Sequence, residues 1–182
     1  MNKEKIHAAV MVLRLSKNLN QHFELQNLAS DHLVLIQRVA GLRHGKEIAF
    51  PGGVIEKEDD SALTAALRET EEELGIPRHI IQHIQPLPSS DTLTGYRIWP
   101  FLGTINTIFE WNIHKEEVHK LFLIPLDDTH QQTKFEMRWI QTPTLSIMNP
   151  TFTIDREKEL VAWGATGRIL WQALHTNLLK SI

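Results

Sequence analysis

One short segment, residues 61–75, constrains the fold of this chain most, because it combines a helical apolar row with an acidic cluster and a glycine stop. Apolar side chains that recur three or four residues apart lie on one face of a helix, where a core can bury them. Gly75 follows the row, and glycine readily takes the left-handed conformation found just past a helix end. The spacing therefore predicts a helix over residues 61–74 that packs through one face. The row consists of Leu63, Ala66, Leu67, Thr70 and Leu74.

Three carboxylates of the same segment, Glu69, Glu72 and Glu73, fall together on a second face of that helix. Like charges at this spacing destabilise a helix by about 0.2–0.5 kcal/mol per pair. A hard divalent cation would reverse the effect, and carboxylates in a chain without cysteine suit Mg²⁺ or Mn²⁺ rather than zinc. Proteins usually hold Mg²⁺ with a few carboxylates and the phosphates of a substrate, so the pattern indicates phosphate chemistry.

Two neighbouring features favour a metal site over the alternative, which is a solvated acidic face. Arg68 lies four residues before Glu72, close enough on a helix to pair with it and orient its carboxylate. Upstream, Pro51-Gly52-Gly53 forms a loop in which bare backbone can approach a ligand. A solvated face requires neither the arginine in register nor the double glycine.

The stretch from Gly53 to Ile76 resembles the signature box of the Nudix hydrolases, which reads G-x5-E-x7-R-E-U-x-E-E-x-G-U with U an aliphatic residue. Thr70 stands where the box has an aliphatic residue. The first half is one residue longer here, so Asp59 or Asp60 takes the place of the first glutamate of the box. The positions that match directly are Arg68, Glu69, Glu72, Glu73, Gly75 and Ile76.

The longer first half also resembles a subgroup of the family, the coenzyme A pyrophosphatases, in which Phe-Pro-Gly-Gly leads into the box as residues 50–53 do here. Residues 35–38 and 42–50 resemble the second motif of that subgroup, and residues 163–170 resemble its last helix. The second motif departs from the pattern at Ile36, Val39 and Lys46. The resemblance implies one Nudix hydrolase domain over residues 1–182, of the α/β class, with an α/β/α sandwich built on a mixed central sheet.

The activity implied by the resemblance is that of a metal-dependent pyrophosphohydrolase, in which an activated water cleaves the diphosphate linkage of coenzyme A or a related nucleoside diphosphate derivative. The box glutamates would hold Mg²⁺ or Mn²⁺ together with the carbonyl of Gly53, and Arg68 would complete the catalytic set. The general base is either a box glutamate or one of Glu116 and Glu117. The last two are read equally well as an acidic helix start before Val118.

Substrate recognition is expected from Arg38 and Arg43, since a guanidinium binds two phosphate oxygens at once, and from the Gly52 and Gly53 backbone. Alternative substrates are ADP-ribose, nucleotide sugars and nucleoside triphosphates. An alternative of another class is a nucleotide sensor that binds without catalysis. The histidines show no paired spacing typical of metal ligands; those considered are His44, His114, His119 and His130.

Composition limits the partners of this chain. Its 182 residues are 42% hydrophobic and 23% charged, which is ordinary for one globular domain. A net charge of −3 offers no basic surface for nucleic acid, and neither a secretory signal nor a membrane span is apparent. We expect a cytoplasmic protein acting on a small diphosphate substrate. Its oligomeric state is left open, with a homodimer as one possibility.

Other segments are assigned by periodicity. Residues 8–15, 32–37 and 96–105 have strand character, whereas residues 159–179 have helical spacing that places Trp163 and Trp171 in the core. Tyr96 and Trp99 are read as strand packing rather than as a stacking site for adenine. Residues 16–30 read as a hairpin insertion or a loop, and residues 86–95 read as a long loop.

Overall fold

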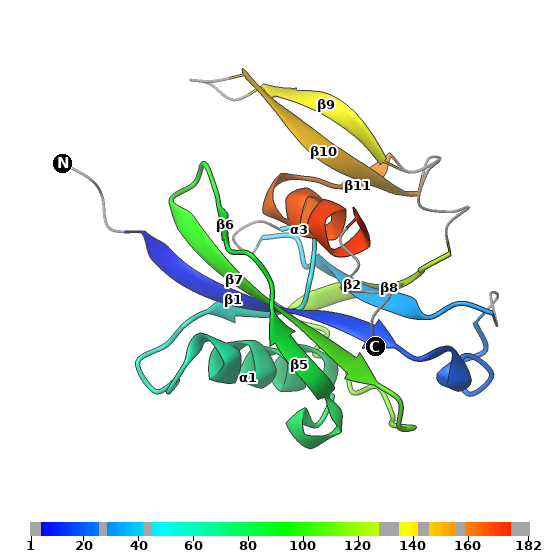
Figure 1. Cartoon of the computed structure of the whole chain (residues 1–182). Coiled ribbons are helices and arrows are strands. Elements are labelled where there is room, and N and C mark those ends of the chain that lie inside the picture. Colours follow the sequence, from blue (N-terminus) through cyan, green and yellow to red (C-terminus); the bar gives the residue numbers. More distant parts are fainter. Residues whose placement is uncertain are drawn as a thin grey trace.

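A computed structural model of the chain describes residues 5–25, 29–41, 45–127, 135–141, 146–155 and 159–175. Its centre is a mixed sheet in which β1 (Ile6–Leu15) runs parallel to β7 (Tyr96–Ile105) along its whole length (Figure 1). On its other side β1 pairs antiparallel with β2 (His32–Arg38) and β4 (Gly52–Val54). The remaining strands pair antiparallel with β2 or β7, namely β3 (Ile48–Ala49), β5 (Gln82–Pro86), β6 (Ser90–Asp91) and β8 (Val118–Pro125).

Both faces of the central sheet are covered, as the near-continuous apolar sequence of β1 requires. Side chains alternate between faces along a strand, so Met11 and Leu13 enter the core beneath α1 (Ala62–Leu74), while Val12 enters the core beneath α3 (Gly164–His175). The two helices lie on opposite sides of the sheet (Figure 1). The α/β/α sandwich with a mixed central sheet is thereby confirmed.

Helix α1 forms where the sequence predicts it, and both of its ends are capped. The hydroxyl of Ser61 accepts a hydrogen bond of 3.1 Å from the Thr64 backbone N–H. At the other end Gly75 takes φ 68°, and its N–H donates to the Glu71 carbonyl at 2.9 Å. The expected apolar row faces the core; its fully buried members are Ala66, Thr70 and Leu74.

A second, three-stranded sheet lies beyond α3, in the order β11 (Leu160–Ala162), β10 (Ser146–Asp155), β9 (Phe135–Gln141) (Figure 1). The helix expected over residues 159–179 is therefore wrong at its start, because residues 160–162 pair with β10 and Gly164 begins the helix. Trp163 and Trp171 were expected in the core but remain 38% and 39% exposed. Residues 176–179 lie outside the described part of the chain.

Two segments predicted as possible loops differ in outcome: the described part of residues 16–30 is a loop, whereas residues 86–95 include a short strand. Residues 16–25 form turns around a short 3-10 helix, Lys17–Leu19, rather than a hairpin, and residues 26–28 are outside the described part. Residues 86–95 contain strand β6. Tyr96 is buried and Trp99 packs on the α1 core, which confirms strand packing for both. Nowhere in the described ranges does a helix have the length and apolarity to cross a membrane.

Gly75→Ala should destabilise the fold by about 1–3 kcal/mol, because a left-handed conformation strains alanine. An added Cβ would also lie 2.5 Å from the Cβ of Asn112. Gly95→Ala is a matched control, since Gly95 has φ 88° but nothing within 4 Å of its position for a Cβ. Chemical denaturation should show a larger loss at Gly75. Equal losses would contradict a role for Gly75 in docking the 112–117 segment against α1.

Candidate active site

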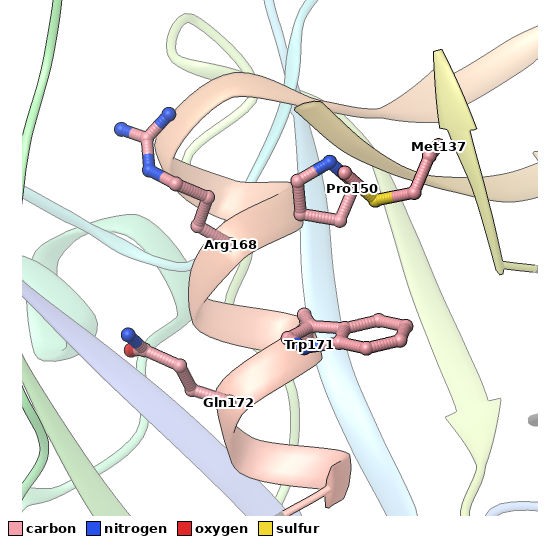
Figure 2. A pocket seen from close by; sticks show the side chains of 5 residues that line it. All are labelled: Met137, Pro150, Arg168, Trp171 and Gln172. Atoms are coloured by element: carbon pink, nitrogen blue, oxygen red, sulfur yellow. The ribbon is translucent and has the colours of Figure 1, made fainter. Parts of the chain in front are cut away.

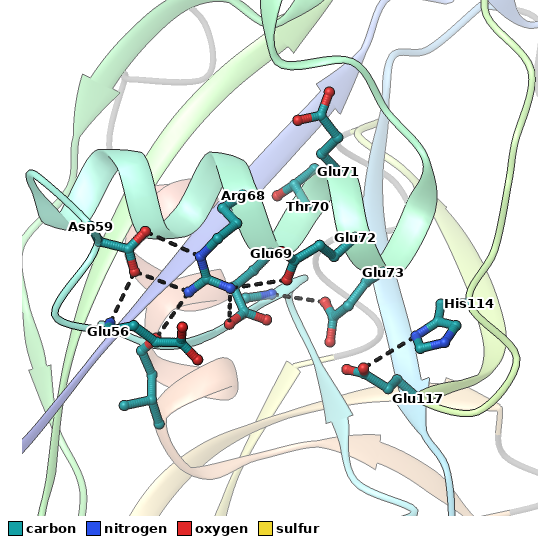
Figure 3. Close-up of polar contacts among 12 residues, drawn as sticks. Glu56, Asp59, Arg68, Glu69, Thr70, Glu71, Glu72, Glu73, His114 and Glu117 are labelled. Carbon is teal, nitrogen blue, oxygen red and sulfur yellow. Dashed lines mark hydrogen bonds and ion pairs between the residues drawn. The ribbon is translucent and has the colours of Figure 1, made fainter.

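Arg68 organises the exposed side of the acidic face of α1 (Figure 3). Its Nη1 donates to Glu69 Oε1 and to Glu72 Oε2, each at 2.9 Å. Its Nε and Nη2 bind both oxygens of Asp59 at 3.1 and 3.0 Å, and Nη2 reaches the Val54 carbonyl at 3.3 Å. The predicted pairing of Arg68 with Glu72 is confirmed.

Asp59, rather than Asp60, is the acidic residue of the loop that contacts the arginine. Hydrogen bonds from Arg68 hold the pKa of the Asp59 carboxyl below its usual value, and the same contacts raise the pKa of Arg68. Asp59 also accepts from the Glu56 backbone N–H at 2.9 Å, which fixes the turn before α1. Asp59 therefore replaces the first glutamate of the box by anchoring the guanidinium.

Glu73 lies on the inner side of the acidic face and is completely buried. Its Oε2 accepts from the Gly52 backbone N–H at 2.9 Å, and its Oε1 accepts from Arg38 Nη1 at 2.9 Å. Burial nevertheless raises the pKa of Glu73 to about 7, outweighing the two donors, and the charges of Glu69 and Glu117 act in the same direction.

Glu69 lies between these two environments and packs against the backbone of Gly53. A Cβ at Gly53 would stand 2.4–2.6 Å from the three carboxyl atoms of Glu69, so only glycine leaves room for this carboxylate. Burial raises the pKa of Glu69, and the neighbouring charges of Glu72 and Glu117 add to the shift. In this structure the group that approaches the bare backbone of Gly53 is the Glu69 carboxylate, whereas the sequence predicts the approach of a ligand.

A fourth carboxylate, that of Glu117, reaches the same region from the segment that follows β7 and precedes β8. Its backbone carbonyl accepts from the Val39 N–H at 2.9 Å, and its Oε1 lies 3.1 Å from Nδ1 of His114. The His114 N–H donates to the Glu73 carbonyl at 3.0 Å and so ties this segment to the end of α1. The reading of Glu116 and Glu117 as a helix start is wrong, because Val118 begins a strand.

His114 is the contact that sequence reasoning missed. The sequence favours a surface or hydrogen-bonding role for this histidine over a metal ligand but indicates no partner, and the structure places its imidazole against Glu117 (Figure 3). Its spacing of three residues from Glu117 lies in a turn, where no periodic pattern indicates which side chains meet. Among the other expected residues, Arg43, His44 and His130 lie outside the described ranges.

The substrate-binding residues expected upstream meet the acidic cluster directly. Arg38 forms an ion pair with Glu73. Gly52 has φ 148°, and a Cβ there would stand 2.3 Å from the Ala9 carbonyl oxygen, so this strand approaches β1 too closely for any side chain. Gly52 and Gly53 therefore hold carboxylates by backbone contact and by lack of bulk.

The donor set suits a hard divalent cation. In the described part of the chain no three acidic or histidine side chains converge closely enough to form a metal site as they stand, since arginines bind Glu69, Glu72 and Glu73. Glu69 and Glu72 nevertheless share one cationic nitrogen of Arg68, and Glu72 is exposed and can turn. Burial is the main cause of the raised pKa values of Glu69 and Glu73, and the charges of nearby carboxylates add to it.

Comparison with known proteins identifies this arrangement. Residues 22–163 match the NUDIX domain family, a range that includes Arg38, the glycine loop, all of α1 and Glu117. The chain belongs to the Nudix family. Its Nudix box is the segment in which Arg68, Glu69, Glu72 and Glu73 are held as described above.

Relatives by sequence include proteins of Salmonella paratyphi B and Salmonella newport described as the uncharacterised Nudix hydrolase NudL. Each is 38% identical over 104 residues, which is 57% of this chain and 54% of the relative. The chain thus spans about half the length of the curated relatives it matches.

Solved structures show the same Nudix fold at low sequence identity. A MutT/nudix family protein from Enterococcus faecalis has a TM-score of 0.58 at 16% identity, covering 98% of this chain and 64% of the other. The Nudix domain of Shewanella oneidensis NrtR, solved with ADP-ribose, has a TM-score of 0.52 at 18% identity, and the match covers 71% of this chain and 78% of the other. A Caenorhabditis elegans Ap4A hydrolase in a binary complex has a TM-score of 0.51 at 17% identity, and the match covers 68% of this chain and 83% of the other.

The buried carboxylate of Glu73 should make stability depend on pH when a chelator is present. Because its folded pKa of about 7 exceeds the ordinary value of 4.5, the folded chain binds more protons between these values. The contribution of the protonated Glu73 carboxyl to the stability of the fold is complete below pH 4.5 and is lost as pH rises through about 7. Glu73→Gln stays neutral, so its free energy of unfolding should decline less between pH 5 and pH 8. Urea unfolding measures this free energy at each pH. The same pH dependence in the unmodified chain and in Glu73→Gln would contradict the raised pKa of Glu73.

Proposed function

We propose that this Nudix chain hydrolyses a phosphoric anhydride bond in a nucleotide-derived small molecule. The observation that supports it most is the placement of four carboxylates from two segments in one region beside the glycine loop. They are Glu69, Glu72 and Glu73 of α1 together with Glu117. Two arginines orient this cluster without neutralising it. Such a cluster is costly unless it binds cations that also contact phosphates.

In this proposal Glu69, Glu72 and Glu73 hold one or more Mg²⁺ or Mn²⁺ ions, with the Gly53 carbonyl as a further ligand. A divalent cation in such a site acidifies bound water and neutralises charge on the phosphoryl oxygens. Arg68 keeps Glu69 and Glu72 turned toward the same point, since its Nη1 bonds both. Arg38 and the Gly52 N–H keep Glu73 in place within the core.

Glu117 is the residue we favour as general base, accepting the proton of the attacking water. Each box glutamate accepts a hydrogen bond from a guanidinium and is proposed above as a cation ligand, so its carboxylate is already engaged. The contact of Glu117 is instead with the imidazole of His114. The hydrogen bond from the Val39 N–H to the Glu117 backbone carbonyl and the contact with the imidazole hold Glu117 beside the acidic cluster. A general base must first lie within reach of the proton that it accepts.

Coenzyme A, or a related nucleoside diphosphate derivative, is the substrate we propose. Support comes from the resemblance of the Phe50-Pro51-Gly52-Gly53 lead-in and the longer loop to the coenzyme A pyrophosphatase subgroup, with Asp59 serving as the anchor of Arg68 within that loop. The structural neighbours solved with ADP-ribose or described as acting on Ap4A have ligands of the same chemical class, a nucleoside joined through phosphoric anhydrides. ADP-ribose, nucleotide sugars and nucleoside triphosphates are the alternatives.

A substrate panel with Mg²⁺ and with Mn²⁺ tests both the reaction and the base. Mass spectrometry of the products should show adenosine 3′,5′-bisphosphate and phosphopantetheine from coenzyme A. Glu117→Gln should lower kcat by about 10²–10⁴-fold, the usual contribution of a general base. Glu116→Gln is the matched control, because Glu116 is the adjacent carboxylate and is largely exposed.

Three outcomes would change the proposal. Turnover of ADP-ribose alone would replace the substrate but keep the reaction. Saturable binding of a nucleotide without any product, with either metal ion, would favour the non-catalytic sensor instead. Near-normal kcat in Glu117→Gln would return the role of base to a box glutamate.

His114 should affect turnover through the position of Glu117 rather than through substrate binding. His114→Ala should lower kcat by about 10–100-fold with little change in KM, since the carboxylate loses its orienting contact. His114→Asn places an amide N–H near the position of Nδ1 and should recover most of that loss. An equal loss in both variants, with unchanged thermal stability, would show that the hydrogen bond to Glu117 is not what matters.

A further inference from the structure

The outer strand of the small sheet, β9, is an exposed edge. Among the described strands it pairs only with β10, so one row of its backbone N–H and C=O groups has no strand beside it. Five of its seven residues are exposed along this strand. Exposed edges of this kind pair readily with another strand, and proteins usually block them with short strands, charged side chains, proline or bulges.

One face of the β9–β10 pair is apolar and only half covered. Residues directly opposite in the register share a face, which pairs Phe135 with Phe152, Met137 with Pro150 and Trp139 with Met148. At the inner end α3 covers this face, where the rings of Phe135 and Trp171 are 5.5 Å apart and Phe152 is buried.

The outer end of the same face is uncovered. Trp139 is 62% exposed, Met137 is 52% exposed and Met148 is 51% exposed. Next to them lies a shallow pocket beside α3 (Figure 2); its walls are Met137, Pro150, Arg168, Trp171 and Gln172. Large exposed apolar side chains gathered on one surface are typical of an interaction site.

The opposite face of β9 carries Glu136 and Arg138, which form an ion pair within the strand. These charges have opposite signs and stand on either side of Met137. If two β9 strands paired antiparallel about Met137, Glu136 of each copy would face Arg138 of the other. Met137 would face Met137, and Phe135 would face Trp139. The strand is therefore complementary to itself, which is the requirement of a two-fold symmetric interface.

We propose that β9 is the interface of a homodimer, in which the small sheets of two copies join edge to edge around Met137. The exposed apolar residues of β9 then lie against their counterparts on one face of the joined sheet, and two Glu136–Arg138 pairs form between copies on the other face. Charges of like sign at these two positions would repel a second copy, whereas Glu136 and Arg138 have opposite signs and are complementary to the same pair in another copy.

Charge exchange on β9 tests this directly by sedimentation velocity and light scattering. The unmodified chain should show a concentration-dependent dimer. Glu136→Lys alone, and Arg138→Glu alone, should each weaken the dimer at least tenfold, because like charges then face each other twice. An equimolar mixture of these two variants should form heterodimers, in which every facing pair is again of opposite sign. The double variant should recover the homodimer.

The mixing experiment separates contact between copies from the ion pair within the strand, since that ion pair is lost in both single variants whether or not they are mixed. Trp139→Asp should also dissociate the dimer, whereas Ile108→Asp, at a residue 61% exposed outside the small sheet, should not. Thermal unfolding checks that all variants fold. The proposal is overturned if the chain stays monomeric at all concentrations, or if mixing fails to recover association.

Discussion

The buried carboxylate of Glu73 is the contact on which the site depends, because it joins separate segments of the chain at one point. Its side chain binds the Gly52 N–H of β4 and Arg38 of β2, while its backbone carbonyl accepts from His114 in the segment before β8. The helix, the glycine loop, the central sheet and the 112–117 segment are thus tied to a single residue. A buried carboxylate is costly on its own, so its donors must be kept in place by the whole fold.

The two arginines of the site have different tasks. Arg38 forms an ion pair with the buried carboxylate of Glu73. Arg68 binds both Glu69 and Glu72 near the surface and is itself held by Asp59. Glu73 is buried beside the sheet, whereas Glu72 is exposed, and under the proposed function a substrate phosphate and cation approach from the side of Glu72. Specificity is then left to surrounding loops rather than to the acidic cluster.

Sequence patterns predicted the parts of this molecule that local spacing determines. The helix over residues 61–74, its stop at Gly75, the strand over residues 96–105 and the pairing of Arg68 with Glu72 all follow from contacts between near neighbours. The choice between Asp59 and Asp60 was left open, because a loop has no period that tells which carboxylate faces an arginine.

The failures share a physical cause, which is that tertiary pairing overrode a local period. Residues 160–162 continue the helical spacing of α3, yet β10 takes them as a strand. Trp171 lies on the face of α3 that borders the pocket rather than the core, and only the position of the small sheet shows this. The contact of His114 with Glu117 depends on a turn whose geometry is set by bonds to α1 and β2, so no spacing rule could have found it.

Under the proposed function, protons and divalent cations compete for the same carboxylates in this site. Burial raises the pKa of Glu73 and Glu69, and repulsion from neighbouring carboxylates adds to the effect, so the folded chain retains protons that a bound cation would have to displace. Cation affinity should therefore rise with pH over the range in which the chelated chain loses stability. The charge that makes the acidic face unfavourable alone is the same charge that favours a cation bridged to phosphate. In this fold the instability of the acidic face is the physical source of its proposed binding function.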